Sequence, residues 1–350
     1  MHKLIKRQQE ILSIIQKNKQ ASNKIIKEKI EKIFGQITRM TIVRDLELLI
    51  KNNLITKHGS GRNVYYQLNQ GSSLLEYFDI EKYFDADFNK RNIKNKFNFD
   101  IFKEINDIII SKNEIIELEK LNKDYQKRMK KLSPAIIKRE YERLIIELSW
   151  KSSAIEGNTY SLLETETLIK ENKAAKGHKK EEALMIFNHK RAIDYIRDKK
   201  SKFKTLNLRK IENIHQLLTE KMNIGKGLRN KPVGITGTNY KPLSNPHQIK
   251  EATEKLIKKI NKIKNPVTKA LILVLMLSYI QPFEDGNKRT ARITANAILL
   301  AHDYCPLSYS SVDETEYKKA MVLFYEQNSA LYFKELFLNQ YKQAINNYFQ

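Results

Sequence analysis

The segment Gln281-Pro-Phe-Glu-Asp-Gly-Asn-Lys-Arg-Thr-Ala-Arg292 joins two helices that the apolar pattern predicts. An apolar run over Pro266–Ile280 precedes it, and a second helix is expected from Thr290 to Ala301. The start of a helix offers unpaired backbone N–H groups and the positive end of the helix dipole, which together bind anions. Three basic residues add positive charge to this predicted anion site: Lys288, Arg289 and Arg292.

An acidic residue, Asp285, lies beside the predicted anion site. Its carboxylate suits Mg²⁺, which usually takes one or two carboxylates together with phosphate oxygens. The residues alone therefore predict a site for the diphosphate of a magnesium-bound nucleotide. The alternative is an ordinary helix start whose basic residues face water.

The same segment resembles the signature of the Fic (Fido-domain) family. That signature is His-Pro-Phe-x-Asp/Glu-Gly-Asn-Gly/Lys-Arg-x-x-Arg, and residues 281–292 match it at every position but the first. The similarity extends from about Leu74 to the C-terminus. It implies a mainly α fold, with a Fic helical core and a short β-hairpin flap within Lys231–Pro242. It also implies ATP and Mg²⁺ as ligands, and transfer of AMP from ATP to a protein hydroxyl (AMPylation).

The resemblance also implies roles for particular residues. Asp285 would hold the metal ion, and Arg292 would meet the γ-phosphate. The nucleotide-binding residues would be Gly286, Asn287, Lys288, Arg289 and Arg292. The flap would align a target protein by strand addition, through Thr236, Gly237, Thr238, Asn239 and Tyr240. Lys288 stands where many members of the family have Gly. In this respect the segment resembles the death-on-curing branch, whose members transfer a phosphate instead of AMP. Some AMP-transferring relatives also have Lys at this position.

Gln281 occupies the position of the signature histidine, which accepts the proton of the target hydroxyl. An amide has no useful basicity near pH 7, so Gln281 cannot act as a general base. Three hypotheses follow: a transferase impaired by Gln281, a nucleotide-sensing transcription regulator without catalysis, or transfer through another base. Glu284 is the least implausible replacement. The sequence does not identify the target protein, and the protein itself is one candidate.

A second motif lies upstream. Ser152, Glu156 and Gly157 match the Fic inhibitory motif Ser/Thr-x-x-x-Glu-Gly/Asn, at the end of a helical run from about Ala135. By resemblance, Glu156 would pair with Arg292 and block productive placement of the γ-phosphate. In isolation, Glu156 would be read as a surface acid before a helix-stopping glycine.

The first 70 residues predict a winged helix-turn-helix. Helices are expected over Gln8–Lys17, after the capping residue Ser22, and from Thr38 to Lys51, followed by a hairpin over Leu54–Leu68. The third helix resembles the recognition helix of DeoR-type regulators, whose first residues meet base edges in the major groove. The candidate DNA-binding residues are Thr38, Arg39, Thr41, Arg44, Lys57 and Arg62. The alternative is a protein-docking or dimerisation module.

The composition of the chain is compatible with this organisation. The 350 residues carry 64 Lys and Arg against 40 Asp and Glu, and the net charge of +24 suits a polyanionic partner. We expect a winged-helix domain over 1–70, a linker at 70–73, a helical connector over 74–140 and a Fic domain over 141–350, with the inhibitory helix near 141–158. The single cysteine, Cys305, excludes an internal disulfide. No apolar run is long enough to cross a bilayer, so we expect a cytoplasmic protein without a membrane partner, and pairing of winged helices would make it a homodimer.

Overall fold

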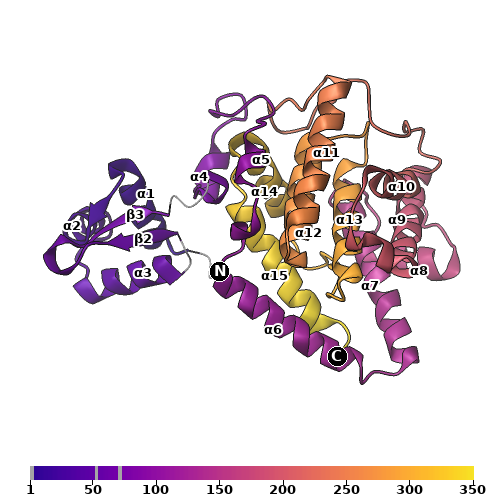
Figure 1. Cartoon of the computed structure of the whole chain (residues 1–350), viewed down its shortest axis with the longest axis horizontal. Helices are drawn as coiled ribbons and strands as arrows, with labels where there is room; N and C mark the ends of the chain where they lie inside the picture. Colours follow the sequence, from indigo (N-terminus) through magenta and orange to yellow (C-terminus); the bar gives the residue numbers. More distant parts are fainter. Residues whose placement is uncertain (1–3, 52–53, 70–72) are drawn as a thin grey trace. The chain divides into compact units, whose positions relative to one another are not determined.

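The computed structural model describes residues 4–51, 54–69 and 73–350, and the predicted linker at 70–73 lies almost entirely outside them. The chain divides into two compact units, residues 1–85 and residues 86–350. The boundary falls inside the segment that we expected to be a connector. Each unit is described separately (Figure 1).

The first unit consists of helices around a small antiparallel sheet. Its helices are α1 (Lys6–Asn18), α2 (Asn23–Phe34), α3 (Arg39–Lys51) and α4 (Ile80–Asp85). Its strands are β1 (Ala21–Ser22), β2 (Ile55–His58) and β3 (Tyr65–Leu68), in the order β1-β3-β2, with Ile55 opposite Leu68. The apolar faces of the first three helices form the core: Ile11, Ile15, Ile26, Ile30, Ile42, Leu46 and Leu49.

Several local predictions for this unit are confirmed. Ser22 caps α2, because its hydroxyl accepts a hydrogen bond from the backbone N–H of Ile25. Thr38 does the same at the start of α3, accepting from Thr41 N–H at 3.3 Å. The hairpin is formed by β2 and β3. The pattern did not predict β1, because two residues carry no period that could reveal a strand.

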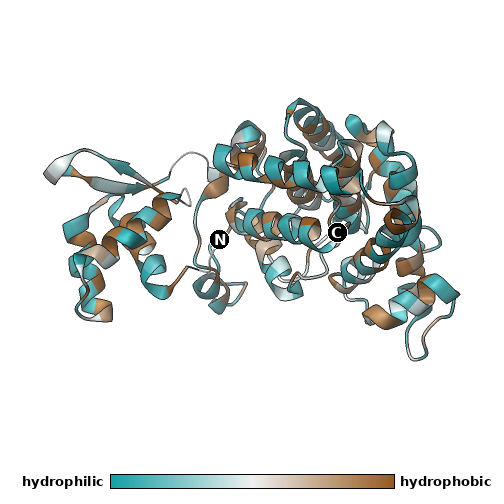
Figure 2. Cartoon of the chain, turned by 90° about the horizontal axis from the view of Figure 1, so that it is seen from below, coloured by the Kyte–Doolittle hydropathy of each residue, from teal (hydrophilic) through white to brown (hydrophobic). Residues whose placement is uncertain are grey.

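The second unit is helical. It comprises α5 (Ile101–Glu104), α6 (Lys112–Met129), α7 (Pro134–Ala154), α8 (Leu162–Glu171), α9 (Lys180–Asp198), α10 (Leu208–Leu218), α11 (Pro246–Lys262), α12 (Pro266–Ile280), α13 (Asn287–Ala301), α14 (Glu314–Gln327) and α15 (Leu331–Asn347). Many of these helices carry hydrophilic and hydrophobic residues along their length (Figure 2), as expected when one face packs and another meets water. None of the helices in the described part of the chain is both long and apolar enough to span a membrane.

Helix α12 is the centre of this unit and is buried along its whole length. It packs against α13, and Figure 1 shows the two helices near the middle of the unit. Burial on all sides explains why its sequence has no polar face. Asn265 caps α12, with Pro266 at its first position, and the helix ends as predicted at Ile280.

The predicted β-hairpin of the flap does not form as paired strands. Residues 231–242, all of them described, contain a turn at Thr236–Gly237 but no strand pair. Two prolines, Pro232 and Pro242, lack the N–H that a ladder needs. The segment is held instead by side chains, because the buried guanidinium of Arg229 donates to the carbonyls of Lys231 and Leu243.

Candidate functional site

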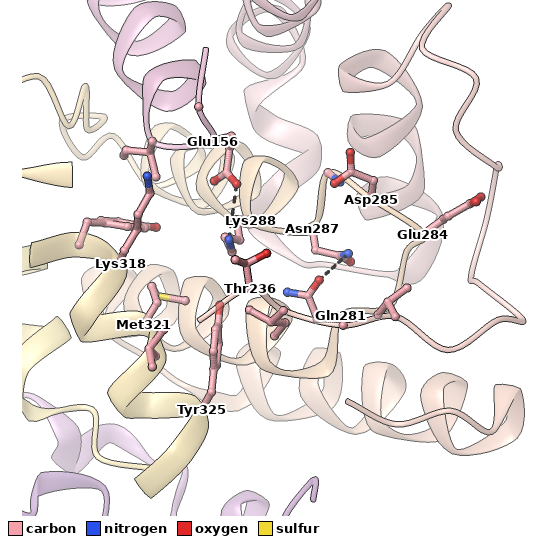
Figure 3. Close-up of a pocket in the computed structure, with 18 residues that line it drawn as sticks. Glu156, Thr236, Gln281, Glu284, Asp285, Asn287, Lys288, Lys318, Met321 and Tyr325 are labelled. Atoms are coloured by element: carbon pink, nitrogen blue, oxygen red, sulfur yellow. Dashed lines mark hydrogen bonds and ion pairs between the residues drawn. The ribbon is translucent and has the colours of Figure 1, made fainter. Parts of the chain in front are cut away.

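A cleft of about 440 Å³ lies at the start of α13. Four segments far apart in the sequence line it: residues 155–157 after α7, residues 233–236 of the flap, residues 281–288 between α12 and α13, and one face of α14. Figure 3 shows the labelled side chains of these segments around the same space. The two motifs that the sequence singled out therefore meet at one cleft.

The loop between α12 and α13 is held in place from within. Gln281, at the C-terminal end of α12, has the left-handed backbone angles φ 50° and ψ 60°. Its amide donates to Ser278 O at 2.6 Å and accepts from Asn287 Nδ2 at 2.9 Å. Asn287 also bonds the backbone N–H and carbonyl of Phe283 at 2.8 Å each. Both polar ends of the Gln281 side chain are thus used by the loop itself.

Gly286 marks the tightest point of the loop. Its φ is +75°, and a Cβ atom there would lie 3.1 Å from Cγ2 of Thr219 and 3.4 Å from the Arg289 guanidinium. Both the backbone angle and the close approach favour glycine. The turn brings the first N–H groups of α13 to the cleft, where the helix itself leaves them unpaired.

His215 supports the loop from behind. Its ring stacks on Phe283, with centroids 4.0 Å apart, and its Nε2 lies 2.9 Å from the carbonyl oxygen of Asp285. Since a carbonyl only accepts, Nε2 carries the proton. Burial is the main cause that lowers the pKa of His215, so the ring is neutral near pH 7 and fixes the backbone of Asp285. These contacts give His215 a structural role in the loop.

The carboxylate of Asp285 remains accessible. Its side chain is 69% exposed and lies 3.4 Å from Arg289. The carboxylate also lines the cleft, so it fits a metal ion that takes one protein carboxylate and otherwise phosphate oxygens. No cluster of three or more His, Cys, Asp or Glu side chains suited to a metal occurs among the described residues.

Glu156 closes the other side of the cleft. Its carboxylate accepts a hydrogen bond from Arg292 Nη2 at 2.8 Å and lies 3.6 Å from Lys288 Nζ, as Figure 3 shows for Lys288. Burial alone would raise its pKa, but the charges of Arg292 and Lys288 lower the pKa to about 2. The carboxylate is therefore ionised at neutral pH. It pairs with Arg292 and Lys288, the two cations that a bound phosphate would need.

Arg292 is fully buried, and a second set of bonds holds it. Its Nε donates to Ser152 Oγ at 2.9 Å and its Nη2 to Ser152 O at 2.9 Å. Ser152 Oγ in turn lies 2.9 Å from His189 Nε2, while His189 Nδ1 donates to Met185 O. Burial lowers the pKa of His189 to about 3, so the ring stays neutral. Its Nε2 therefore accepts a hydrogen bond from the Ser152 hydroxyl. In this conformation Arg292 does not line the cleft and reaches it only through its bond to Glu156.

Not all of the other predicted nucleotide-binding residues line the cleft. Gly286, Asn287 and Lys288 line the cleft, whereas Arg289 does not. The Arg289 side chain is 3% exposed and lies against Asp285 and the sulfur of Met222. Glu284, the candidate replacement base, is exposed at the cleft but accepts a hydrogen bond from Gly225 N–H at 3.0 Å.

The predicted docking residues of the flap also differ in burial and in whether they line the cleft. Thr236 lines the cleft. Thr238 and Tyr240 are buried, and the Tyr240 hydroxyl donates to Tyr279 O at 2.9 Å. Gly237 and Asn239 are exposed, do not line the cleft, and are within hydrogen-bond distance of Arg91 and of residues 88 and 89 respectively.

Sequence reasoning missed the contribution of α14. Tyr317, Met321 and Tyr325 line the cleft at i, i+4 and i+8, and Lys318 lies beside them. Lys318 forms no ion pair with another described residue and is exposed at the cleft. The helical spacing was a signal for a buried face, but nothing in it indicated that this face meets the loop after α12.

In the first unit, the predicted DNA-binding side chains lie mostly at the surface. Thr38, Arg39 and Arg44 of the α3 region and Lys57 of β2 are exposed, whereas Thr41 is half-buried. The side chain of Arg62 lies outside the described residues. Helix α3 is oriented by Asp45, which is buried and accepts from Arg7 at 2.6 Å and Gln8 at 2.8 Å on α1.

Part of the second unit is similar in sequence to known proteins. Residues 205–299 match the model of the Fic/DOC family. Protein adenylyltransferase Fic of Nematostella vectensis is 27% identical over 210 residues, which cover 58% of this chain and 49% of the relative. The chain therefore spans about half the length of that curated relative.

Solved structures share the fold. Fic-1 from C. elegans superposes with a TM-score of 0.57 at 17% identity, covering 69% of this chain and 71% of that one. A Fic domain containing signaling protein from Bacteroides thetaiotaomicron superposes with a TM-score of 0.56 at 20% identity, covering 67% of this chain and 94% of that one. The helical second unit thus shares the fold of these Fic-domain structures. Its residues 205–299 are similar to the Fic/DOC family.

Proposed function

We propose that the cleft binds Mg²⁺-ATP and is built for transfer of AMP to a protein hydroxyl, in a form that Gln281 impairs and Glu156 holds closed. The observation that carries this proposal is the meeting of Glu156, Lys288 and Asp285 around the start of α13. The relative from Nematostella vectensis is described as a protein adenylyltransferase, which supports the same chemistry.

Each residue of the cleft has a physical role in this proposal. The first N–H groups of α13 and Lys288 would bind the phosphates. Asp285 would hold Mg²⁺, which neutralises phosphate charge when bound. Arg292 would reach the γ-phosphate only after Glu156 leaves it. Residues 233–236 of the flap would guide the target chain, whose hydroxyl must lose a proton as the new bond forms.

A sensor without catalysis is the second candidate, and one observation favours it. Both polar ends of Gln281 are engaged by Ser278 O and Asn287, so the residue fits this loop as a structural bridge. Such a loop could still bind a nucleotide through α13. The protein would then report nucleotide binding to its first unit.

Binding of Mg²⁺-ATP to the full chain tests what both candidates share. Lys288→Ala is expected to weaken binding by roughly tenfold, because a cation beside the phosphates is lost. Isothermal titration calorimetry measures this. Lys250→Ala removes the same charge from an exposed position of α11 away from the cleft and serves as the control. Absence of binding by the unaltered chain would overturn both candidates.

We also propose that the first unit is a winged helix that binds DNA. Three helices followed by a hairpin, with Arg39 and Arg44 exposed on α3, support this function. Two such units on a palindromic site would make a homodimer. A protein-docking module would not need basic residues at the start of α3.

Arg39→Ala is expected to weaken binding to duplex DNA several-fold and to reduce the salt dependence, because one cation of the interface is lost. Fluorescence anisotropy with a labelled duplex at several salt concentrations measures both effects. Lys17→Ala, at the end of α1, removes an equal charge and should change binding less. Equal affinities for all three proteins would favour the protein-docking alternative.

A further inference from the structure

The outer edge of the flap is covered by residues 88–98 of the same unit. Lys241 N–H donates to Asn95 O at 2.9 Å, and Lys96 and Lys241 form a parallel bridge. Nearer the turn, Asn239 Nδ2 lies 3.4 Å from Phe88 O. The flap thus has two sets of contacts: residues 233–236 line the cleft, while Gly237, Asn239 and Lys241 contact this segment.

Arg91 lies at the centre of these contacts. Its Nη2 donates to Gly237 O at 2.8 Å and lies 3.3 Å from Glu326 Oε1 on α14. The side chains of Arg91 and Glu326 are 5% and 0% exposed. A buried ion pair is costly to break because one charge would remain uncompensated. The pair therefore fixes the turn of the flap relative to α14.

The rest of the segment is anchored to rigid elements. Lys94 N–H donates to Glu326 O at 2.8 Å, and Asn98 N–H donates to the hydroxyl of Tyr279 at 2.9 Å. Phe97 stacks on Tyr279, with centroids 4.7 Å apart. Tyr279 belongs to the last turn of α12, two residues before Gln281. The segment consequently ties the flap to the two helices that border the cleft.

We propose that Arg91 is a positioning residue for the cleft: through residues 88–98 it holds the flap against α14 and so sets the distance between residues 233–236 and α14. Its effect on ligand binding rests on the proposed nucleotide function, whereas its effect on the flap does not. The chain passes directly from Asp85, the last residue of the first unit, into this segment.

Amide hydrogen exchange of the full chain without nucleotide tests the positioning role. The reporter is the Lys241 N–H, which exchanges only when its bond to Asn95 O opens. Arg91→Ala is expected to accelerate its exchange roughly ten- to hundredfold, the range for loss of a charge-assisted hydrogen bond. Lys90→Ala, which removes a neighbouring exposed cation, should leave the exchange unchanged.

A second variant separates positioning from folding. Arg91→Lys keeps a positive charge beside Glu326 but loses the planar fork that reaches both partners. It should accelerate Lys241 exchange while the amides of α12 keep their protection. Unchanged Lys241 exchange in Arg91→Ala would overturn the proposal. Equal acceleration along α12 in both variants would also overturn it, because Arg91 would then stabilise the whole unit.

Titration with Mg²⁺-ATP adds the functional readout. Arg91→Ala should bind several-fold more weakly than Lys90→Ala, since residues 233–236 would no longer be held at the cleft. If the unaltered chain does not bind Mg²⁺-ATP, the proposed nucleotide function fails, and the exchange data still decide the role of Arg91. If Arg91→Ala binds as tightly as Lys90→Ala, the proposed control of the cleft is overturned.

Discussion

The double variant Gln281→His/Glu156→Gly is expected to incorporate label from ATP marked at the α-phosphate, whereas the unaltered chain incorporates none. The histidine supplies the missing general base, which typically contributes roughly 10²- to 10⁴-fold in rate. The glycine removes the carboxylate that now pairs with Arg292 and Lys288. Autoradiography of the protein itself, with and without cell extract as a source of targets, measures the incorporation.

The backbone at position 281 is suited to the replacement. Its φ of 50° lies in the left-handed region, where histidine is more common than most residues other than glycine. The loop is also held by contacts that do not use the side chain of residue 281, including His215 Nε2 to Asp285 O and Arg229 Nε to Gln281 O at 2.6 Å. A histidine can therefore replace Gln281 without a new backbone conformation.

The two single variants and a second label give this experiment its controls. Gln281→His alone should remain slow because Glu156 still occupies Arg292, and Glu156→Gly alone should remain slow because no base is present. Label from the γ-phosphate instead would mean phosphate transfer, the alternative that Lys288 raised. Label on the unaltered chain would contradict the disabling role of Gln281. No label on any variant, with Mg²⁺-ATP bound by all, would favour the sensor.

Glu156→Gln is expected to lower the free energy of unfolding by about 3 kcal/mol at pH 7. This follows from the pKa of Glu156, which its cationic neighbours lower from 4.5 to about 2, at about 1.4 kcal/mol per unit. A depressed carboxyl pKa stabilises the folded protein fully above pH 4.5. The contribution then declines as the pH falls from 4.5 to 2, so the difference between the two proteins should shrink over this range.

Urea unfolding of both proteins at pH 7, 5, 4 and 3 measures this difference, because groups common to both cancel. Glu314→Gln is the matched control. Glu314 pairs with Lys151 at 3.0 Å, but its side chain is 36% exposed, and such pairs contribute less than about 1 kcal/mol. A difference for Glu156→Gln that does not change with pH would contradict the assigned ion pair.

Much of the first unit could be predicted from sequence, because its signals are local. Ser22 and Thr38 are capping residues, and turn glycines separate two β-rich runs. A helix start or a hairpin depends on residues within a few positions of one another. The exposed side chains of α3 follow from the apolar spacing of Ile42, Leu46 and Leu49 on its other face. Whether they contact DNA stays a prediction.

The flap shows where such reasoning fails. A hairpin was expected there, yet the Gly237 carbonyl and the Lys241 N–H of the flap bond to Arg91 and to Asn95 O. These two partners are remote in sequence, so no local pattern indicates them. The same limit applies to Lys318 and to the face of α14 that lines the cleft.

By itself, the sequence determined which groups are available for chemistry: the residues of the 281–292 loop, the absence of a histidine at its first position, and Glu156 after a predicted helix. Those facts depend only on residue identity and spacing. The tertiary structure decided which of these groups face the cleft. It buries Arg289 and Arg292, places Glu156 against Lys288, and bonds the flap to Arg91. The contacts of Glu156 and of Arg91 join segments more than 100 residues apart, so only the packing of the helices could determine them.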